Sequence, residues 1–334
     1  MQTGTFRKVE REFDIKRQKA QSEAKALKKD IYSKNPILAE LDDEINKIAL
    51  RSAKSRIFSD DISRQVEQDK LEMKIDKINK KFDSELKRVG LSREDFEPKY
   101  ECEKCKDSGY FENKICYCFN QRLINESFKQ SNLSKIDTEN FETFDFGYYS
   151  NSNSVEKYGI EKSPLENIDG IRKIAHKFST SLDEADQKNL LFSGNTGLGK
   201  TFLANCVAAE AIKQGKSVIY QTAPILLDKM VDYKFKYNKT EEEREEYNKI
   251  FEVDLLILDD LGTESMNNAK FSELFSILNT RLLKNKKILI STNLTLQDIK
   301  KEYEERIFSR FIGDFLICRF VGEDIRILKK KMSR

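Results

Sequence analysis

The chain of 334 residues carries a formal net charge of only +3, and its composition is 38% hydrophobic and 35% charged. That balance is too apolar for a chain that is disordered throughout. The small net charge also gives no bulk electrostatic sign of a nucleic-acid partner, so any such contact must come from a local patch. The length predicts about two domains of ~100–200 residues each.

The sequence gives no sign of a membrane protein. Its longest apolar runs are strand-sized, far below the ~20 residues that a membrane-spanning helix needs. The opening stretch MQTGTFRKVEREF lacks the apolar core of a secretory signal. We therefore expect a cytoplasmic protein with no membrane partner, in a compartment where structural disulfides are rare.

Residues 1–95 are dense in charged side chains, almost free of Gly and Pro, and predict a helical region. Asn35-Pro36 predicts a break between two helices. Apolar residues recur in steps of three and four, which places each set on one helix face. The two sets are Leu38, Leu41, Ile45 and Ile48, then Leu71, Ile75, Ile78, Phe82, Leu86 and Val89. These faces pack on each other in the simplest interpretation, and the alternative is that part of the surface docks a partner.

Four of the six cysteines lie within residues 96–134, which we expect to form a small Cys-rich element and a linker. Their spacing is Cys102-x2-Cys105-x10-Cys116-x-Cys118. Four thiolates suit a tetrahedral structural Zn²⁺ site, and the single histidine, His176, is distant in sequence. A thioredoxin-like dithiol requires a βαβ unit, which this stretch does not predict. Free thiols, redox chemistry and an iron–sulfur cluster are the alternatives to zinc.

Residues 135–334 predict an α/β domain. Ser163-Pro164 is typical of a helix start, with an N-cap residue followed by Pro at the first helical position. The short apolar stretches NLLFS, SVIYQ, DLLILDD, KILIST and FLICRF alternate with helical stretches. Strands separated by helices predict a parallel sheet wrapped by helices.

The stretch GNTGLGKT follows the first of these strands and has the spacing of a P-loop. Glycines let the backbone N–H groups surround phosphates, and the helix that follows adds a favourable dipole. We expect Lys200 to reach the β- and γ-phosphates of ATP and the Thr201 hydroxyl to bind Mg²⁺. The predicted nucleotide-binding residues are Gly194, Asn195, Thr196, Gly197, Leu198, Gly199, Lys200 and Thr201.

Polar residues at the ends of two later strands extend this predicted site. Asp259 and Asp260 end the strand DLLILDD, at the edge where doubly wound sheets bind ligands. We expect Asp259 to be the Mg²⁺ partner and Asp260 to orient the attacking water. Asn293 follows KILIST and is the candidate sensor of the γ-phosphate. Ordinary loop acids and an ordinary turn residue are the alternatives.

Three arginines lie beyond these strand ends. Arg306 and Arg310 are four residues apart in YEERIFSRF and share one helix face. Each is a candidate arginine finger, which stabilises the charge that develops during phosphoryl transfer. Surface salt bridges to nearby glutamates are the alternative. Arg326 lies in GEDIRILKKK, near the end of the sequence.

The P-loop, the LDDLG stretch, the strand-end Asn and the later arginines together resemble the AAA+ ATPases over about residues 135–330. Within that class they resemble the DnaC/DnaI-type bacterial helicase loaders and the related IstB transposition helpers. The resemblance implies an ATPase in which Asn293 is sensor 1, Arg310 is the trans-acting finger and Arg326 is sensor 2, with Arg306 as the rival finger. Two features depart from the pattern: Asp260 replaces the usual Glu, and the short stretch after FLICRF predicts a truncated lid.

Helicase loaders of the DnaI type also resemble this chain in their helical N-terminal domain with a Cys-rich zinc element, which IstB-type helpers generally lack. The resemblance implies an ATP-dependent loader of the replicative DNA helicase onto single-stranded DNA during replication initiation. It further implies self-association into an oligomer, with residues 1–95 binding the partner. The alternatives are a transposition helper ATPase and an adaptor that binds ATP as a switch without hydrolysing it.

The stretch LLDKMVDYKFKYNK is the candidate contact for single-stranded DNA, since basic groups follow phosphates and aromatic rings stack on bases. It alternates the two kinds of side chain: Lys229, Lys234, Lys236 and Lys239 with Tyr233, Phe235 and Tyr237. A solvated helix face is the alternative.

Overall fold

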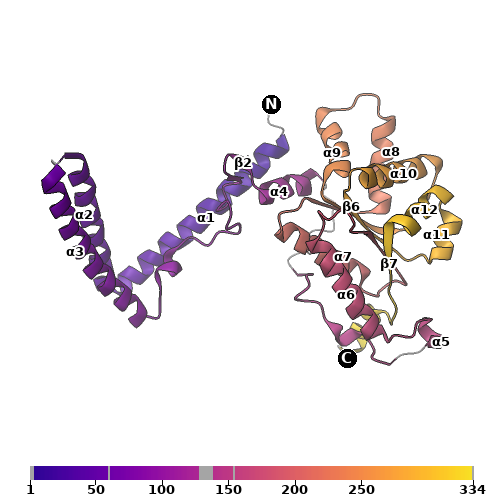
Figure 1. The fold of residues 1–334 in the computed structure, drawn as a ribbon, viewed down its shortest axis with the longest axis horizontal. Helices are drawn as coiled ribbons and strands as arrows, with labels where there is room; N and C mark the ends of the chain where they lie inside the picture. Colours follow the sequence, from indigo (N-terminus) through magenta and orange to yellow (C-terminus); the bar gives the residue numbers. More distant parts are fainter. Residues whose placement is uncertain (1–3, 59–60, 128–137, 153–154, 333–334) are drawn as a thin grey trace. The chain divides into compact units, whose positions relative to one another are not determined.

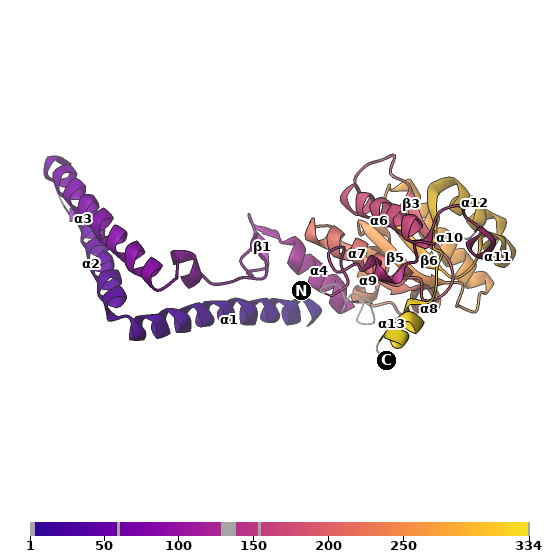
Figure 2. The same ribbon diagram turned by 90° about the horizontal axis from the view of Figure 1, so that it is seen from below.

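The computed structural model describes residues 4–58, 61–127, 138–152 and 155–332 of the chain. They divide into two compact units: Glu10–Lys114, and Met1–Val9 together with Ile115–Arg334. Figures 1 and 2 draw the ribbon from two directions. The predicted boundary between residues 134 and 135 lies outside the described residues.

The unit Glu10–Lys114 is helical, as the sequence predicted. It contains most of α1 (Gly4–Lys34), followed by α2 (Pro36–Phe58) and α3 (Asp61–Arg88). The break between α1 and α2 falls at Asn35, directly before Pro36, because a residue that precedes Pro is disfavoured in the helical conformation. Helices α2 and α3 pack against each other as a hairpin (Figure 1).

This helical unit has a small apolar core. Its centre is formed by Ile31 of α1, Leu38 of α2, and Phe82 and Leu86 of α3, all buried. Among the residues whose spacing predicted the two faces, five are buried: Leu38, Ile48, Ile78, Phe82 and Leu86. Val89 lies beyond the end of α3 and is 39% exposed. The interpretation that these faces pack on each other is therefore confirmed for the part of the hairpin formed by the first half of α2 and the second half of α3.

The second unit is built on five parallel strands. The strands are β3 (Asn189–Ser193), β4 (Val218–Thr222), β5 (Leu255–Leu261), β6 (Lys287–Thr292) and β7 (Phe315–Arg319). Their order across the sheet is β4-β5-β6-β3-β7. Each strand coincides, within one residue at either end, with one of the five apolar stretches, so the predicted parallel sheet is confirmed.

Helices cover both faces of the sheet (Figure 1). On one face α6 (Pro164–Thr180) and α7 (Lys200–Lys213) pack on alternate strand residues; on the other, α8 (Ala223–Phe235), α10 (Asn268–Leu283) and α12 (Glu305–Asp314) do so. Among the described residues this unit also contains the α-helices α4 (Tyr117–Ser127), α5 (Val155–Tyr158), α9 (Glu241–Glu252), α11 (Leu296–Glu302) and α13 (Ile325–Met332). In the described ranges, no helix has both the length and the apolar content needed to cross a bilayer.

Helix α4 covers the edge strand β4. The Gln121 side chain accepts a hydrogen bond from the Val218 N–H (2.9 Å) and donates one to the Val218 carbonyl oxygen (2.8 Å). An edge strand otherwise presents unpaired backbone groups on which other chains can pair. The side-chain amide therefore replaces a neighbouring strand at this position and fixes α4 to the sheet.

A fully buried arginine joins the amino ends of β5 and β6. These strand ends lie at the edge of the sheet opposite to the one that carries the P-loop. The Arg281 guanidinium of α10 donates to the carbonyl oxygens of Ile250 (2.7 Å), Val253 (2.9 Å) and Lys287 (2.7 Å). These carbonyls lie at the end of α9, in the turn before β5 and at the start of β6. Such a charge is tolerated in the interior because hydrogen bonds replace its solvent.

Candidate nucleotide-binding site

The P-loop connects β3 to α7, and Lys200 is the first residue of that helix. The Lys200 ammonium donates to the carbonyl oxygens of Gly194 (2.6 Å) and Asn195 (2.8 Å) and to Asn293 Oδ1 (2.8 Å). Lys200 and Asn293 meet because β3 and β6 are parallel neighbours in the sheet. The segments that follow these two strands therefore leave the sheet at the same edge. The structure thus brings together a predicted phosphate ligand and the predicted sensor.

Burial lowers the pKa of the Lys200 ammonium to about 8, and the carboxylates of Asp260 and then Asp259 oppose that shift. Burial also raises the pKa of the Asp260 carboxyl group, and the neighbouring charge of Asp259 adds to this effect. Both pKa shifts have the same main cause, because burial removes water from the charged form of each group and makes that form less stable. Groups perturbed in this way gather at functional sites.

Two P-loop glycines are required by close contacts as well as by backbone conformation. Gly197 and Gly199 have φ angles of +81° and +91°, a region that residues with a Cβ rarely adopt. A Cβ on Gly197 would overlap the Asp324 carboxylate, and one on Gly199 would lie 2.5 Å from the Tyr149 hydroxyl. That hydroxyl donates to the Leu198 carbonyl oxygen (3.1 Å). The P-loop is therefore held by a segment that precedes the sheet and by another that follows it.

Asp259 lies near the carboxyl end of β5, next to Thr201, and is buried. Its Oδ1 accepts a short hydrogen bond from the Ser291 hydroxyl and lies 3.4 Å from the Thr201 hydroxyl. Its Oδ2 accepts a hydrogen bond from the Tyr220 hydroxyl (2.9 Å). A carboxylate beside a hydroxyl at the start of the P-loop helix is the hard oxygen donor set that suits Mg²⁺.

Asp260 has a left-handed backbone conformation, with φ of +55°. Its N–H donates to Ser291 Oγ (3.1 Å), and its carbonyl oxygen accepts from the Thr263 hydroxyl (2.8 Å). Non-glycine residues adopt this region at a cost of about 1–3 kcal/mol, and residues held in this way cluster at active sites and ligand clamps, although Asp tolerates the region better than most. The turn places the Asp260 side chain at the cavity that also contacts Lys200 and Asn293.

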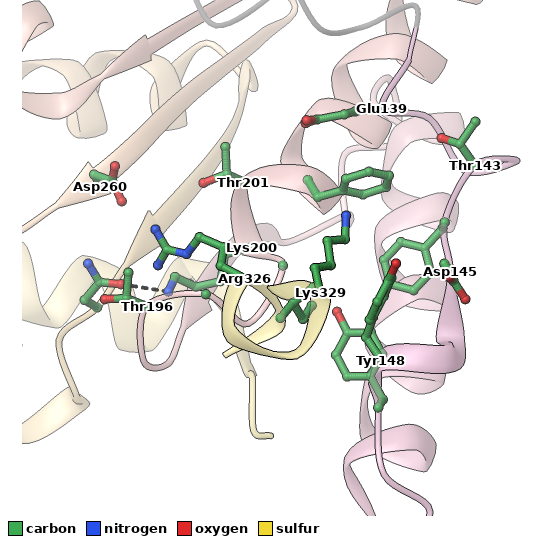
Figure 3. Close-up of a pocket in the computed structure, with 17 residues that line it drawn as sticks. Glu139, Thr143, Asp145, Tyr148, Thr196, Lys200, Thr201, Asp260, Arg326 and Lys329 are labelled. Atoms are coloured by element: carbon green, nitrogen blue, oxygen red, sulfur yellow. Dashed lines mark hydrogen bonds between the residues drawn. The ribbon is translucent and has the colours of Figure 1, made fainter. Parts of the chain in front are cut away.

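A cavity of about 600 Å³ extends from the P-loop along the start of α7, within the size range of small-molecule sites. Figure 3 shows Asp260, Lys200 and Arg326 toward one end, Tyr148 and Asp145 toward the other, and Lys329 between them. The lining residues are Glu139, Thr143, Phe144, Asp145, Tyr148, Tyr149, Thr196, Gly197, Gly199, Lys200, Thr201, Phe202, Asp260, Asn293, Ile325, Arg326 and Lys329. A cationic end with P-loop N–H groups fits a polyphosphate, and the aromatic end fits a base.

Helix α13, which follows β7, brings Arg326 to the cavity. The N–H of Ile325 donates to the Gly197 carbonyl oxygen (2.9 Å), which fixes the start of α13 against the P-loop. The Arg326 guanidinium contacts the Asp324 carboxylate (3.3 Å from Nε), and Lys329 follows one turn later. Helix α13 therefore brings two cations, Arg326 and Lys329, to the cavity.

The two candidate fingers lie on α12 and do not line this cavity. The Arg310 guanidinium donates to Asn279 Oδ1 of α10 (2.9 Å) and lies 3.6 Å from the Asp314 carboxylate. Its side chain is 40% exposed, and Arg306 is exposed. Neither arginine reaches the nucleotide site of its own chain.

Sequence reasoning did not identify several residues of this site. The segment 138–149 supplies most of the aromatic end of the cavity, and Tyr220 and Ser291 hold Asp259. The only sequence signal for the segment is the close spacing of Phe141, Phe144 and Phe146, which indicates packing onto another part of the chain and nothing more specific. No signal marked Tyr220 or Ser291, because each occupies an ordinary strand position.

The four clustered cysteines come together as predicted. Their sulfur atoms all lie within 4.8 Å of one another, and no disulfide joins them. Four Zn–S bonds of ~2.3 Å in a tetrahedron would separate the sulfur atoms by about 3.8 Å. The donor set and its spacing therefore fit a structural zinc ion.

The turn around the first cysteine pair is closed by Asp107. Its buried carboxylate accepts from the N–H groups of Glu101 (2.9 Å) and Cys102 (2.8 Å). Lys106 and Asp107 both have positive φ angles, which turns the chain sharply after Cys105. A two-stranded hairpin of β1 (Tyr110–Phe111) and β2 (Lys114–Ile115) then leads toward the second cysteine pair.

The basic and aromatic stretch proposed for DNA forms most of α8 and the turn before α9. Three of its lysines pair with glutamates: Lys229 with Glu246 (2.6 Å), Lys234 with Glu273 (2.5 Å) and Lys236 with Glu243 (2.5 Å). Tyr233 stacks on Tyr247 with ring centroids 4.3 Å apart. Phe235 and Tyr237 are 71% and 100% exposed. The exposed part of this stretch is thus more aromatic than basic.

Comparison with known proteins places the site in a recognised group. Residues 127–326 match the family described as IstB-like ATP binding protein. The replicative helicase loader DnaC of Escherichia coli K12 is 26% identical over 175 residues, which are 52% of this chain and 69% of that protein. The chromosomal replication initiator DnaA of Aquifex aeolicus is 35% identical over 142 residues, or 42% of this chain and 34% of that protein. The crystal structure of the DnaI aligns with a TM-score of 0.43 and 22% identity, over 57% of this chain and 93% of that one.

Proposed function

Since the chain belongs to the IstB-like ATP-binding protein family, we propose that it is an ATPase that loads the replicative DNA helicase onto single-stranded DNA during replication initiation. The observation that carries the ATPase is the convergence of Lys200, Thr201, Asp260, Asn293 and Arg326 on one cavity. Homology to the helicase loader DnaC supports the role in loading. The clustered cysteines after a helical region favour this role over that of a transposition helper.

The polar residues at the P-loop end of the cavity, together with Asp259 beside it, have separate roles in the proposed hydrolysis of ATP. Lys200 and the P-loop N–H groups bind the β- and γ-phosphates, and Arg326 adds positive charge at the same end. Mg²⁺, when bound beside Thr201 and Asp259, neutralises phosphate charge. Asp260 orients water for attack on the γ-phosphate, and Asn293, hydrogen-bonded to Lys200, responds to the presence of that phosphate.

The domain roles follow from this proposal. Residues 1–95 form the helical region that binds the helicase, residues 96–134 form the zinc element and linker, and residues 135–334 form the ATPase domain with its short lid. Zinc would hold the turn around the two cysteine pairs, where the chain has few apolar residues of its own to bury. Small elements of this kind commonly depend on metals for folding.

Loading can be measured with the full chain, circular single-stranded DNA and the replicative helicase of the same organism. We expect the helicase to be retained on DNA circles only when the chain and ATP are both present, and to co-purify with the tagged chain from extract. Unchanged retention with and without the chain would contradict helicase loading. Recovery of a transposase in place of the helicase would favour the transposition helper.

Zinc content tests the metal proposal. Protein purified without chelator is expected to contain about one zinc per chain, and Cys105→Ser is expected to lose it together with stability of the cysteine element. Cys318→Ala is a matched control, because Cys318 is a buried cysteine in β7 outside the cluster. A wild-type chain that is folded but free of zinc would rule out the structural metal.

Arg310 is proposed to complete the ATP site of a neighbouring subunit, because it lies outside the cavity of its own chain. Removal of an arginine finger can slow hydrolysis by ~10³-fold or more. Arg310→Ala and Lys200→Ala proteins are each expected to be inactive, the second for want of phosphate binding. In a mixed assembly, an intact Lys200 site can face an intact Arg310, so partial ATPase activity should return.

The same mixing experiment with Arg306→Ala serves as the comparison. Recovery with Arg306→Ala, and no defect in Arg310→Ala, would assign the finger to Arg306. If no mixing ratio restores activity while assembly is verified by light scattering, neither arginine acts in trans.

Single-stranded DNA is proposed to bind at the turn between α8 and α9. Stacking of an exposed ring on a base contributes about 1–3 kcal/mol, so Phe235→Ala and Tyr237→Ala should each weaken binding in a fluorescence titration. Replacing Lys234 and Lys236 by Ala should lower the salt dependence by about one slope unit per lost phosphate contact. Leu283→Ala, at an exposed apolar side chain of α10, is the control. Affinities and salt slopes equal to those of the wild type would place the DNA site elsewhere.

A further inference from the structure

The Tyr220 hydroxyl connects two elements that carry the proposed Mg²⁺ ligands. Tyr220 lies in β4 and is fully buried. Its hydroxyl donates to Asp259 Oδ2 at the end of β5 (2.9 Å) and lies 3.4 Å from the carbonyl oxygen of Thr201 in the first turn of α7. One side chain therefore fixes the distance between the strand that carries the carboxylate and the helix that carries the hydroxyl.

Ser291 holds the other oxygen of the same carboxylate. Its hydroxyl donates to Asp259 Oδ1 and accepts the N–H of Asp260 (3.1 Å). Tyr220 and Ser291 come from β4 and β6, the two strands that flank β5 in the sheet. With a donor on each oxygen, the carboxylate cannot turn about its own axis, and Oδ1 stays on the side of the Thr201 hydroxyl.

We propose that Tyr220 is a positioning residue for metal-dependent nucleotide binding, which it serves by orienting the Asp259 carboxylate toward Thr201. This inference rests on the proposed function, because it requires a nucleotide and a divalent cation at this site. Tyr220 does not line the cavity and acts through Asp259. A solely structural hydroxyl would stabilise the sheet but leave the metal dependence of nucleotide binding unchanged.

Tyr220→Phe removes the hydroxyl and keeps the ring in its place between the sheet and α7. The test uses the full chain with a fluorescent ADP analogue, first in EDTA and then with increasing MgCl₂. Free Mn²⁺ is also measured by electron paramagnetic resonance in the presence of ADP. A hydrogen bond to a charged group commonly contributes enough for a ~10-fold change or more. We therefore expect Tyr220→Phe to need about tenfold more Mg²⁺ or Mn²⁺ for half-saturation, with unchanged nucleotide affinity in EDTA.

Tyr303→Phe is the matched control. Tyr303 is also a buried tyrosine whose hydroxyl donates to a carboxylate, that of Glu264 (2.5 Å), and it lies outside the cavity. Its loss should lower the melting temperature without changing the metal dependence. Replacement of Tyr220 by 4-aminophenylalanine restores a donor at the same position and should return half-saturation toward the wild-type metal concentration, which also tests the proposal if Tyr220→Phe folds poorly.

Equal metal half-saturation for Tyr220→Phe and the wild type would overturn the positioning role. So would an equal loss of nucleotide affinity in EDTA and in Mg²⁺, because that pattern indicates general damage to the site. A wild-type chain that binds no nucleotide under either condition would instead overturn the proposed function, and this inference with it.

Discussion

The candidate nucleotide site of the second unit is organised around one buried cation, the Lys200 ammonium, at the carboxyl edge of the parallel sheet. A charge removed from water is tolerated only where polar partners replace the solvent. Three oxygens do so here, two from the P-loop and one from Asn293. That arrangement requires β3 and β6 to be neighbours, as they are. Once this pairing is set, β5 lies beside β6, and Asp259 and Asp260 reach the same edge.

Two segments complete the site around the P-loop. One precedes the strands of the sheet along the chain, and the other follows them. Tyr149 precedes the sheet and contacts Leu198, whereas Asp324 follows it and packs on Gly197. A nucleotide in the cavity would therefore touch chain segments separated by about half of the sequence. Helix α13 needs only to start against Gly197 for Arg326 to reach the cavity.

The sequence predicted those features that depend on local pattern. Five apolar stretches predicted the five strands, and the P-loop spacing predicted the turn that places Lys200. Features that depend on contacts between distant residues were not predictable. The lysines in and after α8 predicted a contact for DNA, but three of them, Lys229, Lys234 and Lys236, pair with glutamates of α9 and α10. Tyr220 and Ser291 gave no signal, because only the order of strands across the sheet brings them to Asp259. The sequence predicted Arg326 as a site residue, but not the backbone hydrogen bond from Ile325 to Gly197 that fixes the start of α13 beside the P-loop.

Calorimetric titration of the full chain with ATP and Mg²⁺ tests most directly whether the buried Lys200 forms a nucleotide site. The wild type should bind one ATP per chain. Lys200→Ala should weaken binding by ~10-fold or more, since a charged hydrogen bond to phosphate is lost. Lys188→Ala, at an exposed lysine just before β3, should bind as the wild type does. Equal ATP affinity for wild type and Lys200→Ala would contradict a nucleotide site at this P-loop.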